Sequence, residues 1–285
     1  MLIDALKILG PCLSTDLADH LMKAHGLSAE AARQRVSRAP AEVKRLGHLP
    51  FPRKARFVYL QSQFASESYW DNLYKAIYET KGAYAKALGA VEARGVVPLE
   101  HFMIACGAPI AQKKHISADS VLQRLVSANV LVIDSLPGIG KCIMTKQTSE
   151  DYDGKSDELL AKTNARLLAE SILLDSIKEW LRRLALVSYH KVSLRTPNQA
   201  SPKIGTFCWD LAAPSYISAL STWSRGSDPS IKPGWVVCDV LLNHEAKQKH
   251  VDAFIYKAQS TIALKNVSKT IFVFVAERYD SSAFN

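Results

Sequence analysis

Apolar residues at helical spacing predict three short helices at the start of the chain. The first covers 2–9, a second begins with an N-cap at Ser14, and a third begins with an N-cap at Ser28 and runs to about residue 39. Residues 43–49 and an apolar run at 56–60, separated by a turn at 51–54, predict a two-stranded hairpin after these helices. The predicted order is helix, helix, tight turn, helix, hairpin.

The next part of the chain repeats some of this order. Residues 66–95 have the apolar spacing of helices, and 99–105 predict another helix. A further helix begins at an N-cap on Ser117, and two strands follow at 130–134 and 141–145. The sequence therefore predicts a helical segment and a second, similar unit over 66–147.

The most polar stretch, 148–158, predicts a linker between an N-terminal and a C-terminal half. After it the pattern changes to one long amphipathic helix and then mostly strands, in the order α, β, β, β, α, β. The expected elements are a helix at 159–185, strands at 187–194, 204–211 and 235–242, a helix at 250–264 and a strand at 271–276. The whole chain is thus expected to belong to the α+β to α/β class, with domains at 1–65, 66–147 and 159–285.

Positive charge is concentrated at the N-terminus. The chain has a formal net charge of +9, and its first sixty residues hold 10 Lys and Arg against 5 Asp and Glu. Such an excess is expected of a surface that faces phosphates. The second unit differs, because its corresponding helix has Arg124 as its one cation. We therefore expect that unit to serve in packing or dimerisation rather than in base recognition.

The third helix carries the polar side chains expected of a DNA-recognition helix. With the hairpin that follows, this region resembles a winged helix-turn-helix, in which the second helix of the pair enters the major groove. Arginine binds guanine edges, Gln and Ser reach bases or phosphates, and hairpin cations contact the backbone. The predicted DNA-binding residues are Arg33, Gln34, Arg35, Ser37 and Arg38 on the helix, with Arg35 at its flank, and Arg53, Lys54 and Arg56 in the wing.

The composition excludes several other classes. The five cysteines are scattered and never spaced as C-x-x-C, which argues against a zinc finger and a disulfide framework. No apolar run approaches membrane-spanning length, and the N-terminus lacks the features of a secretory signal. We expect a protein without membrane partners, located in the cytoplasm and associated with the nucleoid.

Two aspartates interrupt otherwise apolar strands in the C-terminal half. Asp210 lies late in one predicted strand and Asp239 in the next. A buried carboxylate is costly unless a metal or a cation pairs with it. With the order α, β, β, β, α, β, these positions resemble the core of PD-(D/E)XK nucleases over about 159–276. The resemblance implies that Asp210 and Asp239 bind Mg²⁺, which positions and activates water for phosphodiester cleavage.

The chain departs from that family pattern in two places. Asp210 follows Trp209 instead of Pro, and Asp239 is not followed by the usual acidic-x-Lys lysine. Some members carry the cation on the next helix, where this chain has Lys257, and some supply a carboxylate from the first helix, where this chain has Glu170. The resemblance therefore implies Asp210, Asp239, Lys257 and Glu170 as catalytic residues.

Three hypotheses remain open from the sequence. The first is a double-stranded-DNA-binding protein with a Mg²⁺-dependent endonuclease domain, acting in bacterial defence against foreign DNA or in mobile-element biology. The second is a non-catalytic DNA-binding regulator whose degenerate nuclease fold serves dimerisation. The third is an adaptor whose winged helices bind a protein partner.

Overall fold

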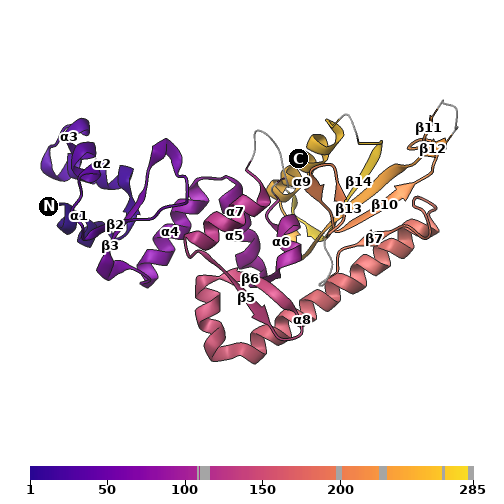
Figure 1. The fold of residues 1–285 in the computed structure, drawn as a ribbon, viewed down its shortest axis with the longest axis horizontal. Helices are drawn as coiled ribbons and strands as arrows, with labels where there is room; N and C mark the ends of the chain where they lie inside the picture. Colours follow the sequence, from indigo (N-terminus) through magenta and orange to yellow (C-terminus); the bar gives the residue numbers. More distant parts are fainter. Residues whose placement is uncertain (108, 110–115, 197–200, 225–229, 265–266, 282–285) are drawn as a thin grey trace. The chain divides into compact units, whose positions relative to one another are not determined.

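The computed structural model describes the chain except for residues 108, 110–115, 197–200, 225–229, 265–266 and 282–285. It has mixed α and β structure, as the pattern predicted, and forms two compact units (Figure 1). Unit 1 comprises 1–89 and 121–131, and unit 2 comprises 90–120 and 132–285. These units differ from the predicted domains, because the predicted segment 66–147 is divided between them. Among the described helices, none has the length and apolar character needed to cross a bilayer.

Unit 1 begins with a helical region closed by a small sheet. Its three strands are antiparallel and lie in the order β1-β3-β2, so that β3 is central. The predicted helices and hairpin are confirmed, while β1 was not predicted because two residues are too few to show a period. The elements are α1 (Leu2–Leu9), β1 (Cys12–Leu13), α2 (Ser14–His25), α3 (Ala29–Ser37), β2 (Val43–Arg45) and β3 (Phe57–Leu60).

The N-caps predicted at Ser14 and Ser28 have different outcomes. Ser28 caps α3, since its Oγ accepts a hydrogen bond from the backbone N–H of Ala31 at 3.2 Å. The prediction for Ser14 was wrong, because Leu13 occupies the N-cap of α2. Ser14 instead accepts a hydrogen bond from the backbone N–H of Arg56 at 2.9 Å. Its side chain therefore joins the start of α2 to the segment that enters β3.

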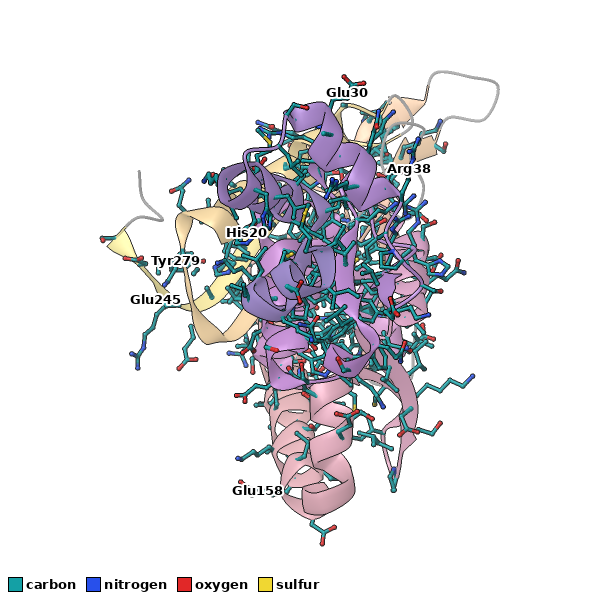
Figure 2. All side chains as sticks on the ribbon, turned by 90° about the vertical axis from the view of Figure 1, so that its left-hand side faces the viewer. His20, Glu30, Arg38, Glu158, Glu245 and Tyr279 are labelled. Carbon is teal, nitrogen blue, oxygen red and sulfur yellow. The ribbon has the colours of Figure 1, made fainter. Side chains whose placement is uncertain are left out.

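The core of unit 1 fixes which face of α3 is exposed. Ala32 and Val36, one helical turn apart, are buried with Leu17 and Leu21 of α2 and with Val58 of β3. Since successive turns of a helix present the same face, the remaining positions of α3 are directed toward solvent. Figure 2 shows the exposed side chains of Glu30 and Arg38 projecting outward from this region.

The order of the first six elements recurs further along the chain, after α4 (Glu67–Glu79). The second sheet has the order β4-β6-β5, which matches β1-β3-β2. The helix predicted from Ser117 is confirmed, and the Ser117 Oγ accepts the N–H of Ser120 at 3.2 Å. The recurring elements are α5 (Ala83–Arg94), β4 (Val96–Pro98), α6 (Leu99–Ala105), α7 (Ala118–Ser127), β5 (Leu131–Leu136) and β6 (Gly140–Thr145).

The predicted linker at 148–158 is wrong, because these residues lie within the long helix α8 (Lys146–Arg183). The helix begins where the Oγ1 of Thr145 accepts the N–H of Thr148 at 3.1 Å. Pairs spaced by four residues, such as Glu158 with Lys162 at 2.6 Å, stabilise its exposed face. The sequence of its first turns is polar and lacks an apolar stripe, as the sequence of a linker does, which explains the error.

Unit 2 is built on a four-stranded mixed sheet in the order β14-β13-β10-β7. The last two strands in the chain, β13 and β14, are parallel, and α9 connects them; the other neighbours are antiparallel. The elements are β7 (Ser193–Leu194), β10 (Leu211–Ser215), β13 (Gly234–Ala246), α9 (Gln248–Ile262) and β14 (Thr270–Tyr279), with two separate hairpins, β8 (Lys203–Ile204) with β9 (Phe207–Cys208) and β11 (Thr222–Ser224) with β12 (Ser230–Lys232).

Two predicted strands differ from those observed. The run 187–194 forms a strand only at Ser193–Leu194, and the run 204–211 is interrupted at Gly205. Gly205 has a φ of 67°, a left-handed conformation that glycine adopts without a steric penalty. The chain therefore turns there into the β8–β9 hairpin, and the sheet strand β10 begins only at Leu211. The predicted strands at 235–242 and 271–276 and the helix at 250–264 are confirmed.

The two long helices of unit 2 cover opposite faces of the sheet. Val236 and Cys238 of β13 pack with Leu174 and Leu181 of α8. Val237, which alternates with them, packs in a separate cluster with Phe254 of α9. Because successive side chains of a strand point to opposite faces, even positions of β13 face α8 and odd positions face α9.

Candidate functional site

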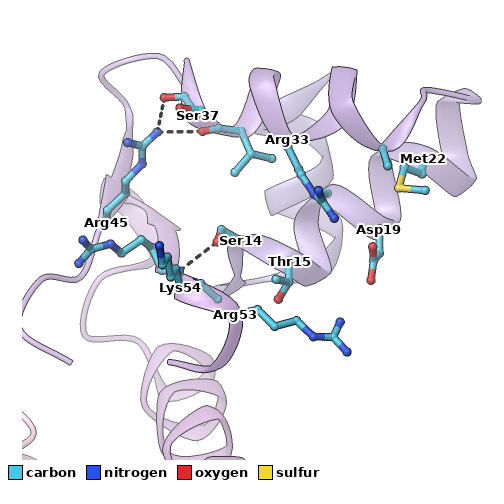
Figure 3. A pocket seen from close by; sticks show the side chains of 14 residues that line it. Ser14, Thr15, Asp19, Met22, Arg33, Ser37, Arg45, Arg53 and Lys54 are labelled. Carbon is cyan, nitrogen blue, oxygen red and sulfur yellow. Dashed lines mark hydrogen bonds between the residues drawn. The ribbon is translucent and has the colours of Figure 1, made fainter. Parts of the chain in front are cut away.

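A basic hollow of about 600 Å³ lies in unit 1 between α2, α3 and the segment that enters β3 (Figure 3). Its lining includes one carboxylate, Asp19, and five cations. The small apolar side chains of Ala18, Ala29 and Ala55 leave its floor open. The cations are Arg33, Arg45, Arg53, Lys54 and Arg56. Because one sign of charge dominates this concave surface, it favours an anionic ligand.

The hollow contains some of the residues predicted to contact DNA and not others. Arg33 and Ser37, one turn apart on α3, line it together with the three wing cations. Gln34, Arg35 and Arg38 are exposed but are not part of its lining. The Nη1 of Arg35 lies 2.9 Å from the Sδ of Met1, so this side chain is directed toward α1. Arg33 is therefore the α3 cation best placed for a ligand in the hollow.

Arg45 is a member of the hollow that the sequence pattern did not reveal. Its Nη2 donates to the backbone carbonyls of Val36 and Ser37 at 2.8 and 2.7 Å. These carbonyls end α3 and have no partner within the helix, so a cation stabilises them. Arg45 was missed because the contact joins β2 to α3; its one sequence signal is a cation within the predicted strand 43–49.

Two consecutive cations of the hollow have a strained backbone. Arg53 and Lys54 have φ values of 54° and 59°, which side chains other than glycine rarely adopt. Such a conformation costs about 1–3 kcal/mol per residue and is concentrated at functional segments. The turn places both cations beside the hollow, where Figure 3 shows them across from Arg33.

Unit 2 contains a buried ionic cluster centred on Arg195. Its Nε donates to the Oδ1 of Asp210 at 2.5 Å, and its Nη1 donates to the Oε2 of Glu170 at 2.8 Å. The side chains of Arg195 and Asp210 are only 9% and 3% exposed, so solvent screens this pair weakly. The guanidinium thus joins β7 to the helix α8 and to the residue that precedes β10.

The second oxygens of both carboxylates also have donors. The Oε1 of Glu170 accepts from Nη1 of Arg166 at 2.8 Å, and Oδ2 of Asp210 accepts from the backbone N–H of Val240 at 2.7 Å. Burial by itself would raise the pKa of Glu170, but the charges and hydrogen bonds of Arg195 and Arg166 lower it below its usual value. Both partners therefore hold this carboxylate in its ionised form.

His101 of α6 completes the cluster as a neutral ring. Its Nδ1 lies 2.8 Å from Nη1 of Arg195, and its Nε2 lies 2.9 Å from the carbonyl oxygen of Thr196. Since the guanidinium can only donate and the carbonyl can only accept, Nδ1 accepts and Nε2 carries the proton. Burial and the charge of Arg195 lower the pKa of His101 to about 4.

The His101→Gln variant should show how this ring contributes to stability. A histidine whose pKa is depressed from 6.5 to about 4 stabilises the fold above pH 6.5, and this contribution is lost as the pH falls toward 4. We expect the destabilisation caused by His101→Gln to shrink by about 2 kcal/mol between about pH 7.5 and about pH 5. Urea unfolding at both pH values measures it.

A matched control for this measurement is His190→Gln, because His190 is exposed. Loss of this surface side chain should change the free energy of unfolding by less than about 0.5 kcal/mol. A pH-independent effect of His101→Gln would mean that burial does not lower the pKa of the His101 ring.

A second buried ion pair joins Asp239 of β13 to Lys257 of α9. The Nζ of Lys257 donates to Oδ2 of Asp239 at 2.6 Å and lies 4.0 Å from the centre of the Trp209 ring. Burial raises the pKa of Asp239 to about 6, although the ammonium of Lys257 opposes the shift. The Oδ1 of Asp239 is buried without a hydrogen-bond partner among the described residues.

The four residues predicted for catalysis are thus brought together as two clusters. Glu170 and Asp210 share Arg195, whereas Asp239 pairs with the predicted cation Lys257. Asp239 occupies an odd position of β13 and faces α9, while Asp210 pairs with Arg195, which also contacts Glu170 of α8. Each carboxylate already has a protein cation within hydrogen-bond distance.

The residues around Asp210 do not fit Mg²⁺, the ion implied by the resemblance to nucleases. All four oxygens of Glu170 and Asp210 accept hydrogen bonds from protein donors. Three guanidinium groups, those of Arg94, Arg166 and Arg195, line the same cavity and exceed the two carboxylates in charge. Mg²⁺ requires several oxygen ligands at about 2.1 Å. Among the described residues, no group of three His, Cys, Asp or Glu side chains is arranged to hold a metal.

The sequence pattern did not single out Arg195 or His101, although each has a weak signal. Arg195 directly follows the predicted strand 187–194, and His101 interrupts a short apolar helix. Comparison of the chain with models of known families, with curated proteins and with solved structures found no significant match. The function must therefore be argued from the two sites themselves.

Proposed function

We propose that this protein binds double-stranded DNA through the basic hollow of unit 1. The observation that carries the proposal is the convergence of five cations from α3, β2 and the wing on one concave surface. Cations in such a surface neutralise phosphates and release counterions, which is the main source of non-specific affinity for DNA. The hollow supplies them from two sides, as the groove and the flanking backbone of a duplex require.

The arrangement of elements supports a winged-helix mode of binding. The order α1, β1, α2, α3, β2, β3 with the sheet order β1-β3-β2 supports a winged helix-turn-helix, in which α3 would be the recognition helix. Under this proposal Arg33 reads base edges, and the three wing cations contact phosphates. The repeat of the order at α5 to β6 is proposed as a packing module, since Arg124 of α7 donates to the hydroxyl of Tyr84 at 3.0 Å.

For unit 2 we propose a nuclease-like fold that does not catalyse metal-dependent cleavage of DNA. The sheet order β14-β13-β10-β7, covered by α8 and α9, supports the resemblance to PD-(D/E)XK proteins. The cations of Arg195 and Lys257 oppose Mg²⁺ binding at the predicted acidic residues. The second hypothesis, a non-catalytic DNA-binding protein with a degenerate nuclease fold, therefore agrees best with the geometry.

The salt dependence of DNA binding tests the proposed interface. The variant Arg53→Gln, Lys54→Gln, Arg56→Gln removes the three cations of the hollow that the proposal places on the DNA backbone. The slope of log K against log salt should decrease by about 3, since each lost phosphate contact contributes about 0.9. Fluorescence anisotropy of the full chain with a labelled duplex of about 25 base pairs, long enough for several phosphate contacts, measures this slope.

A control with the same loss of charge comes from Lys7→Gln, Lys23→Gln, Lys75→Gln. These three lysines are exposed in unit 1 and do not line the hollow. The control should keep most of the wild-type slope, and far-UV circular dichroism checks that both variants fold. Equal slopes in the two triple variants, or no duplex binding by the wild type, would contradict the proposal.

A further inference from the structure

Three ligand-type atoms from three parts of unit 2 face the guanidinium of Arg195. The Oε2 of Glu170 and the Nδ1 of His101 each lie 2.8 Å from its Nη1, and the Oδ1 of Asp210 lies 2.5 Å from its Nε. Each of the three residues is at most 7% exposed. The cation therefore lies inside a buried set of two carboxylates and one neutral imidazole.

This set has the chemistry of a transition-metal site but the spacing of a guanidinium site. Two carboxylates and an imidazole suit divalent ions such as Mn²⁺ and Zn²⁺. Metal–ligand distances of about 2.0–2.2 Å are shorter than the contacts that these atoms make with Arg195. As they stand, the described residues include no arrangement of three such ligands around a metal position. The space is instead matched to a planar, hydrogen-bonding cation.

We propose that Arg195 is a built-in cation that occupies and closes a divalent-metal site formed by His101, Glu170 and Asp210. The wild-type protein binds no divalent metal at this cluster, because the guanidinium remains charged and saturates the ligand atoms. Removal of the Arg195 side chain leaves two buried carboxylates and a deprotonated Nδ1, which then bind Mn²⁺. This inference about unit 2 is independent of DNA binding by unit 1.

The orientation of the His101 ring supports this assignment. Its Nε2 proton is directed to the carbonyl of Thr196, so its Nδ1 lone pair is directed to Arg195. A metal-binding histidine has this same arrangement, in which one nitrogen donates to a carbonyl and the other binds the metal. The second hydrogen bonds of Glu170, from Arg166, and of Asp210, from Val240, would orient the other two ligands.

Mn²⁺ binding to Arg195→Ala, Arg195→Lys and wild-type protein tests the proposal. Electron paramagnetic resonance of free Mn²⁺ gives the bound stoichiometry, and the thermal midpoint reports stabilisation. We expect one Mn²⁺ per chain for Arg195→Ala and a rise in Tm on the order of 5 °C at saturating Mn²⁺. The wild type and Arg195→Lys, which keep a cation in place, should bind no Mn²⁺ at this position.

The ligands are identified by a second substitution. Arg195→Ala combined with Glu170→Gln should lose the bound Mn²⁺ and the rise in Tm. If Arg195→Ala unfolds without metal, Mn²⁺ should restore its native circular dichroism. Arg195→Gln also removes the cation and leaves a smaller gap in the cluster, so it serves as a second test. Two results overturn the proposal: Mn²⁺ binding by the wild type that Glu170→Gln abolishes, or failure of both Arg195→Ala and Arg195→Gln to bind Mn²⁺ or to refold with it.

Discussion

Asp210→Asn is expected to lower the free energy of unfolding of unit 2 by about 3–5 kcal/mol. The substitution keeps the shape of the side chain but removes one of the two carboxylates that neutralise Arg195, which is buried. Arg94 and Arg166 line the same cavity, so the excess of positive charge in the cluster increases. An uncompensated buried charge is far more costly than the loss of a solvated pair. Urea unfolding followed by tryptophan fluorescence measures the change.

The control for Asp210→Asn is the same substitution at an exposed ion pair of α8. Asp175 pairs with Lys178 at 2.5 Å, but its side chain is 55% exposed. Asp175→Asn should change the free energy of unfolding by less than about 1 kcal/mol, because water screens such a pair. If both variants lose the same stability, the Arg195 cluster is solvated rather than buried.

Lys257→Met is the second substitution with a large expected effect. It removes the ammonium group of α9 that forms the ion pair with Asp239 of β13, so the buried carboxylate loses its cation. We expect a loss of about 3–5 kcal/mol near pH 8, measured by urea unfolding. The double variant Lys257→Met, Asp239→Asn removes both charges and should recover stability to within about 1 kcal/mol of the wild type.

The pH dependence of Lys257→Met distinguishes a lost charge from lost packing. Burial already raises the pKa of Asp239 to about 6, and removal of the ammonium raises it further. A carboxyl with a raised pKa stabilises the fold at low pH, and this contribution is lost as the pH rises through the folded-state pKa. The cost of Lys257→Met should therefore be smaller at about pH 5 than at pH 8. A cost that is the same at both values would indicate lost contacts with Trp209 instead.

The strongly periodic segments were the parts of the fold that the sequence could predict. The apolar spacing around Leu17, Leu21, Ala32 and Val36 gave α2 and α3 because a buried helical face repeats every three to four residues. The beginning of α8 was missed because its polar first turns lack such a stripe. The hairpin at Gly205 was missed because an apolar run does not show where the backbone turns.

The candidate sites were predictable only in part. Exposed cations on α3 and charges inside apolar strands were visible as departures from a pattern, which is how Arg33, Asp210 and Asp239 were found. The role of Arg45 was not visible, since it depends on the position of β2 beside the last carbonyls of α3. The DNA contacts of Gln34 on α3 and of Arg38, the C-cap residue of α3, stay predictions.

The pattern of residues along the chain was enough to predict the mixed α and β composition, the order of the main elements and the presence of costly charges within apolar strands. Which cations pair with those charges depends on how the chain folds. Arg195 contacts Glu170, 25 residues away, and His101, 94 residues away. Electrostatic energy depends on distance and burial rather than on sequence separation. For this reason the fold, and not the motif, assigns guanidinium and ammonium groups to the acidic residues that the pattern had suggested for a metal.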